Sequence, residues 1–157
     1  MIISLAIVLD GLITYFIPGY YFNIDLLYPM LTVSLIPFLY SNNYKKYFTI
    51  IFITGFIYDL LYSNLFLYNT ILFLLLAHID IKLIKYFKGK LLFYLLLIII
   101  NIIIYDLAGF IIVYFTNYQD ITIFHLLYKL KNSFLLNIMS GFVYYFWFMK
   151  KRNIHKM

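Results

Sequence analysis

The feature that most constrains this chain is a series of long apolar runs separated by short polar breaks. From Tyr47 to Ile79 the only charged side chain is Asp59, and from Leu91 to Phe115 the only one is Asp106. Hydrophobic residues make up 66% of the chain and the mean hydropathy is +0.95, whereas a water-soluble domain is nearer half apolar. Since lipid accommodates such an excess, the sequence predicts an integral membrane protein.

A helix that crosses the bilayer needs about 20 residues, and the apolar runs supply six such segments. We therefore expect an all-α fold, a compact bundle of six transmembrane helices in a single domain over residues 1–157. The expected spans are residues 2–17, 26–40, 47–62, 65–80, 91–115 and 133–149. Apolar residues at helical spacing over 120–131 predict a short amphipathic helix lying in the membrane interface.

The basic residues indicate the orientation of this bundle. Twelve basic and six acidic residues give a net charge of +6, and in membrane proteins Lys and Arg gather on the cytoplasmic side. With six spans and a cytoplasmic N-terminus, ten of the twelve basic residues lie inside, and Lys129 and Lys131 of the interfacial helix lie outside. We expect both termini in the cytoplasm. No basic stripe with interleaved aromatics lies outside the apolar runs, so we exclude nucleic acid as a partner.

Six polar residues are expected at membrane depth: Asp10, Asp59, Asn69, Asn101, Asp106 and Asn137. No expected span contains Lys or Arg, so these carboxylates should lack a cationic partner and depend on protonation, hydrogen bonds or water. One interpretation is a polar cluster that holds the helices together. The other is a polar cavity, or a notch that docks another protein, opening toward the outside. Gly55 shares a helix face with Asp59 and would let a neighbouring helix approach closely.

Catalytic patterns are weak. Tyr58-Asp59 and Tyr105-Asp106 are similar to the paired aspartates of intramembrane aspartyl proteases, in which two carboxylates share a proton, but the Gly-x-Gly-Asp context of those enzymes is missing. The three histidines lie far apart without metal-ligand spacing, and there is no cysteine. We expect no enzymatic activity, no metal and no cofactor.

Several short motifs together resemble the rod shape-determining MreD family. They are Pro29 opening the second span, Gly55-Phe56-x-x-Asp59 in the third, Leu67-x-Asn69 opening the fourth, and Ser133 to Asn137 in the last. The family often has a second glycine just before the aspartate, where Ile57-Tyr58 stands, and a glycine where Leu67 or Tyr68 stands. A proline often seen after the final asparagine is also absent here.

The resemblance implies a non-catalytic membrane subunit of the cell-elongation complex, or elongasome, in the bacterial cytoplasmic membrane. Such a subunit docks an MreC-like protein and thereby helps direct lateral peptidoglycan synthesis and cell shape. The actin-like MreB filament and the RodA–transpeptidase synthase are implied as indirect partners, with membrane lipids around the bundle. The implied architecture is similar to that of the substrate-binding S-component of energy-coupling-factor vitamin transporters, which is the alternative function. Ser4, Ala6 and Gly11 lack the Ala-x-x-x-Ala spacing expected of such a component.

Overall fold

The computed structural model describes residues 2–16, 30–40, 43–63, 65–86, 91–116 and 123–154, and within these ranges all regular secondary structure is helical. In chain order the elements are α1 (Ile2–Phe16), α2 (Leu31–Leu35), the 3-10 helix η1 (Ile36–Leu39), α3 (Tyr44–Tyr62), α4 (Tyr68–Tyr86), α5 (Leu91–Thr116) and α6 (Ile123–Ile154). The expectation of an all-α chain is therefore confirmed.

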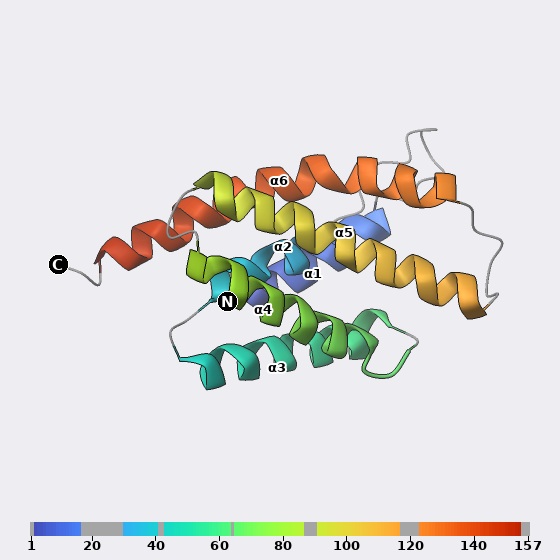
Figure 1. The fold of residues 1–157 in the computed structure, drawn as a ribbon, viewed down its shortest axis with the longest axis horizontal. Coiled ribbons are helices and arrows are strands. Elements are labelled where there is room, and N and C mark those ends of the chain that lie inside the picture. Colours follow the sequence, from blue (N-terminus) through green and yellow to red (C-terminus); the bar gives the residue numbers. More distant parts are fainter. Residues whose placement is uncertain are drawn as a thin grey trace.

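The short helices α2 and η1 form the centre of the molecule. Figure 1 shows α3 beside α4 on one side and α5 beside α6 on the other, with α1 and α2 between the two pairs. Helix α2 contacts α1, α5 and α6, and η1 contacts α4, α5 and α6. Every residue of α2 is buried, and Leu35 and Ile36 have no exposed surface. The core is thus built around one short central segment.

This central segment corrects the second expected span, residues 26–40. Its described part holds five α-helical and four 3-10 residues, which rise about 15 Å, half of a ~30 Å hydrocarbon core. Pro37 lies in the first turn of η1, where its missing N–H is tolerated. Tyr40 then leaves the helix with φ −51° and ψ 131°. Surrounding helices, and not lipid, cover the segment.

A second correction concerns the expected interfacial helix over 120–131. Its described part, from Ile123, is the beginning of α6, a continuous helix of 32 residues that also contains the expected span 133–149. The junction contains no glycine or proline that would break the helix. Ser133 instead donates from its hydroxyl to the carbonyl of Leu130 at 2.9 Å, a bond within the helix. Lys129 and Lys131 therefore belong to α6, a helix that packs beside α5.

The remaining helices follow the expected spans with shifted ends. α3 begins at Tyr44 because the side chain of Asn43 accepts from the backbone N–H of Lys46 at 3.1 Å and so caps the first turn. α4 begins at Tyr68, later than the expected span 65–80, and continues to Tyr86. α5 covers the expected span 91–115 with one residue added.

The apolar interior also contains acidic side chains, and the outer faces of the helices also carry large apolar ones. Four aspartates with described burial, Asp10, Asp59, Asp80 and Asp106, lie in the interior. Large apolar side chains are exposed along the long helices, for example Leu60 on α3 (68%), Leu92 on α5 (76%) and Phe146 on α6 (66%).

By length and composition, one described helix, α5 over Leu91–Thr116, is long and apolar enough to cross a membrane. The apolar stretch Ile2–Ile13 of α1 is shorter.

Candidate functional site

Asp59 on α3 accepts four hydrogen bonds from the first turn of α4. Its Oδ1 accepts from the backbone N–H of Asn69 at 2.8 Å and from the Asn69 side-chain amide at 3.0 Å. Its Oδ2 accepts from the backbone N–H of Thr70 at 2.8 Å and from the Thr70 hydroxyl at 2.6 Å. Both carboxylate oxygens are therefore satisfied by α4, and the residue is only 6% exposed.

These bonds complete the backbone hydrogen bonding at the start of α4. The N–H groups of Tyr68 and Ile71 bond to backbone oxygens at 3.4 and 3.0 Å. The two donors between them, those of Asn69 and Thr70, are the ones that Asp59 accepts. The first N–H groups of a helix need partners from outside the helix, and negative charge is favoured there by the helix dipole. Asp59 is thus an N-cap supplied by the preceding helix.

Leu67, directly before α4, turns the chain into this capped position. Its φ is 61°, the one positive φ among the described non-glycine residues. This left-handed conformation costs a residue with a side chain about 1–2 kcal/mol. Glycine adopts positive φ readily, whereas leucine does not.

Gly55, one turn before Asp59, is the point of closest approach between α3 and α4. A Cβ placed on Gly55 would lie 2.7 Å from the Cα of Thr70 and 3.3 Å from the backbone oxygen of Asn69. These neighbours are backbone atoms, so they cannot move aside as a flexible side chain could. The glycine is therefore what allows Asp59 to reach the first turn of α4, as its spacing predicted.

The same junction extends to α5 through Asn69. The hydroxyl of Tyr105 donates to Asn69 Oδ1 at 2.6 Å, and the Tyr105 ring packs against Tyr68 and Phe73 of α4 at centroid distances of 6.4 and 6.2 Å. Asn69 thus uses its amide toward Asp59 and its oxygen toward α5. We call Asp59, Asn69, Thr70 and Tyr105 the α4 cap cluster.

Asp106 has a cationic partner, which corrects the expectation that no carboxylate at depth would have one. Lys129 Nζ lies 2.9 Å from Asp106 Oδ1; the Asp106 side chain is fully buried and that of Lys129 is 36% exposed. The contact joins charged groups of α5 and α6. The prediction failed because the segment containing Lys129 is continuous with α6 and lies beside α5, not flat in an interface.

Asp10 on α1 repeats the capping arrangement at the start of α2. Its Oδ1 accepts from the backbone N–H of Leu31 at 2.8 Å, and its Oδ2 accepts from the N–H and hydroxyl of Thr32 at 3.0 and 2.7 Å. Asn137 of α6 accepts from the N–H of Met30 through Oδ1 at 3.0 Å. Two long helices therefore hold one end of the central segment.

A further polar contact joins α4 and α5. Asn101 donates from Nδ2 to Asp80 Oδ2 at 3.1 Å, and both residues have no exposed surface. Sequence reasoning treated Asp80 only as the end of the fourth span and missed it as an interior residue. The spacing did contain a signal, because Asp80 follows the buried Phe73, Leu76 and Ala77 on one helical face.

The six predicted polar residues thus lie in the interior but not in one site. Asp59 and Asn69 belong to the α4 cap cluster, Asp10 and Asn137 meet at the start of α2, and Asn101 and Asp106 each have a separate partner. Gly55 lies at the α3–α4 crossing, and Pro29 lies outside the described residues. All six serve contacts between helices of this chain, and none is presented to the outer surface.

This arrangement is suited to holding helices in register. A carboxylate pair that activates water needs two acids sharing a proton, whereas both oxygens of Asp59 are occupied by donors of α4. Among the described residues, no group of three or more metal-ligating side chains comes together. These positions provide helix caps, hydrogen bonds and an ion pair between helices.

Comparisons of the chain with models of known protein families, with curated proteins and with solved structures found no match.

Proposed function

We propose that this chain is a multi-pass protein of the bacterial cytoplasmic membrane, in which α1, α3, α4, α5 and α6 cross the bilayer and α2–η1 forms a short, buried second pass. The exposed apolar side chains and the buried aspartates support this proposal. Helices satisfy their backbone hydrogen bonds internally, as hydrocarbon requires. The short pass is accommodated because its neighbours, and not lipid, surround it.

The orientation we propose has both termini in the cytoplasm. Figure 1 shows that α3 begins, α4 ends and α6 ends at the same end of the molecule. These helix ends carry Lys45 and Lys46, Lys82 and Lys85, and Lys150 to Arg152. Under the positive-inside rule that end faces the cytoplasm, and the turn at Phe66, with 82% of its surface exposed, faces outward.

Within that membrane we propose a non-catalytic role as an MreD-like subunit of the cell-elongation complex. The observation that carries this proposal is that the motifs of the resemblance contact one another. Gly55 and Asp59 of one motif contact Asn69 of the next, and Leu67, one of the two positions where the family pattern often has a glycine, has a positive φ. The Ser133–Asn137 element reaches the N–H of Met30, directly after Pro29. Residues whose contacts depend on one another are expected to occur together in the motifs of a family.

The partner contact we propose is indirect. Because the α4 cap cluster is buried, an MreC-like protein would bind the outer apolar surface of helices whose positions the cluster fixes. Close packing drives association between helices in lipid. Through MreC, the chain would be linked to MreB and to the RodA–transpeptidase synthase.

Depletion of the chain in its host tests this function. We expect cells to become round or wide, and an MreC-like protein to co-purify with the tagged chain in detergent. Asp59→Leu should reduce this co-purification while membrane insertion persists. Normal cell shape on depletion, together with a vitamin-like solute retained by the purified chain, would overturn the proposal in favour of the transporter S-component.

A further inference from the structure

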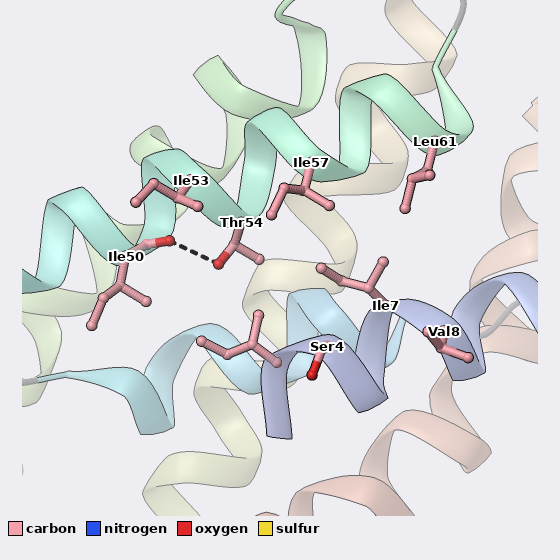
Figure 2. A pocket seen from close by; sticks show the side chains of 9 residues that line it. Ser4, Ile7, Val8, Ile50, Ile53, Thr54, Ile57 and Leu61 are labelled. Atoms are coloured by element: carbon pink, nitrogen blue, oxygen red, sulfur yellow. Dashed lines mark hydrogen bonds between the residues drawn. The ribbon is translucent and has the colours of Figure 1, made fainter. Parts of the chain in front are cut away.

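A groove runs between α1 and α3 on the outer surface of the bundle. It has a volume of about 420 Å³, and all of its lining residues except Ser4 and Thr54 are aliphatic: Ile3, Ile7, Val8, Ile50, Ile53, Ile57 and Leu61. Figure 2 shows the α3 side chains along one wall and those of α1 along the other. Ile7 and Thr54 are nearly fully buried and form the floor, whereas Ile53 and Leu61 are at least half exposed and form the rim.

The dimensions of the groove fit a single flexible chain. From Ile50 to Leu61 the helix rises about 17 Å. A volume of about 420 Å³ over that length leaves a cross-section of about 25 Å². This is room for one unbranched hydrocarbon chain lying along α3.

The lining also lacks a polar group directed at the occupant from α3. The Thr54 hydroxyl donates to the backbone oxygen of Ile50 at 2.7 Å, as Figure 2 shows. The side chain thereby uses its hydrogen-bonding group within its own helix. The α3 wall of the groove therefore offers an occupant mainly apolar packing contacts, which suit an acyl chain.

At the end of the groove where α3 begins, the lining residues are preceded on α3 by a lysine. Lys46 lies four residues before Ile50, so it continues the stripe of Ile50, Thr54, Ile57 and Leu61 on one face of α3. Both Lys45 and Lys46 are exposed, but Lys45 is rotated off this stripe by about 100°. A ligand with its hydrocarbon part in the groove would therefore place a head group near Lys46, and an anionic one would be favoured.

We propose that the α1–α3 groove binds one acyl chain of an anionic phospholipid, with the phosphate of its head group at Lys46. This inference rests on the proposed membrane location and not on the role in cell elongation. The site would lie in the cytoplasmic leaflet, where the first turn of α3 is placed by the orientation proposed above. It would hold a lipid at a fixed position beside α1 and α3.

The experiment measures phospholipid retained by the purified full-length chain. The chain is reconstituted in nanodiscs of equal phosphatidylglycerol and phosphatidylcholine, extracted in mild detergent, and its bound lipid is identified by native mass spectrometry. We expect about one phosphatidylglycerol per chain. Ile57→Trp, which fills the groove, should remove it, whereas Leu60→Trp, on an exposed position of α3 outside the lining, should not.

The lysine variants test the head-group contact without altering the packing. Lys46→Gln should lower the ratio of phosphatidylglycerol to phosphatidylcholine about fivefold, the effect of one lysine near an anionic surface, and Lys45→Gln should leave the ratio near that of the unmodified chain. Equal effects of the two lysine variants, or equal lipid in the two tryptophan variants, would overturn the site. A chain that purifies from the soluble fraction would also overturn it, since it rests on embedding in lipid. Normal cell shape on depletion, with lipid still bound, would remove only the elongation role.

Discussion

At the scale of single residues, the structure depends on side chains that satisfy the ends of other helices. Asp59 and Asp10 each accept from two consecutive backbone N–H groups and from a threonine hydroxyl. In an apolar environment an unsatisfied N–H is costly. These aspartates are therefore structural in a specific sense, since each one determines where another helix begins.

Asp59→Leu is expected to destabilise the folded chain by about 2–4 kcal/mol, because two N–H groups at the start of α4 lose their partner and each unsatisfied group costs about 1–3 kcal/mol. Unfolding of the detergent-purified chain by heat or denaturant measures this loss. Thr49→Val removes an exposed hydroxyl that donates to the carbonyl of Lys45 within α3 and serves as the control. Equal stability of the two variants would contradict the capping role.

Leu67→Gly is expected to stabilise the chain by about 0.5–1 kcal/mol. The gain comes from relief of the left-handed conformation at φ 61°, and it is partly offset by the greater flexibility of glycine in the unfolded chain. Leu65→Gly, in the same turn but without a positive φ, should give no gain. A destabilised Leu67→Gly variant would show that the leucine side chain matters more than its backbone strain.

At the scale of elements, the pairs α3–α4 and α5–α6 are held by different means. Between α3 and α4 the backbones touch at Gly55 and the carboxylate of Asp59 joins the two helices. Between α5 and α6 a glycine again allows close packing, since a Cβ on Gly141 would lie 2.4 Å from Ile98 Cδ1. The Lys129–Asp106 pair adds a charge contact near the other end of these helices.

Gly55→Ala is expected to destabilise the chain by about 1–3 kcal/mol, the cost of overpacking a close contact, because its Cβ would lie 2.7 Å from a backbone atom. Gly109→Ala on α5 is the matched control, since its Cβ would lie 3.4 Å from the Tyr68 hydroxyl, an ordinary contact. It should be neutral or slightly stabilising, because alanine favours the helix. Thermal unfolding compares the two, and equal effects would show that α3 and α4 can separate at little cost.

Lys129→Gln is expected to destabilise the chain by about 1–2 kcal/mol. The Lys129 side chain is 36% exposed, so the value should fall between the 0–1 kcal/mol of a surface pair and the 3–5 kcal/mol of a broken buried pair. Adding Asp106→Asn should recover most of the loss, because the uncompensated buried charge is removed. A double-mutant cycle of unfolding free energies measures the coupling, with the exposed Lys131→Gln as control; a coupling near zero would contradict the pairing.

Much of this element structure could be predicted from the sequence, and two of the failures share one cause. The apolar runs predicted the positions of α3, α5 and most of α6, because the hydrophobicity of a run depends only on its own residues. The start of α4 and the short length of α2 depend on residues from other helices, namely Asp59 and Asp10. The same distinction applies to the candidate site. The sequence predicted that these polar residues lie within the apolar segments, whereas only the packing shows which of them contact one another.

At the scale of the whole molecule, orientation is the property most directly open to measurement. The chain contains no cysteine, so a single introduced cysteine reports its own location without background. In intact cells, Phe66→Cys at the exposed α3–α4 turn should react with a membrane-impermeant maleimide, whereas Lys45→Cys should react only after the membrane is permeabilised. The reverse labelling would invert the proposed topology, and labelling of both in intact cells would refute it.

The N-caps that α1 and α3 supply to α2 and α4 also limit how the chain could enter a bilayer. Neither α2 nor α4 contains the acceptors for two N–H groups of its own first turn, so each would enter hydrocarbon with these groups unsatisfied if it were released alone. The smallest unit that can leave a translocon with these N–H groups hydrogen-bonded is a pair of helices, α1 with α2 or α3 with α4. Biogenesis would then proceed by hairpins, and the last helix would complete the first pair when Asn137 reaches Met30.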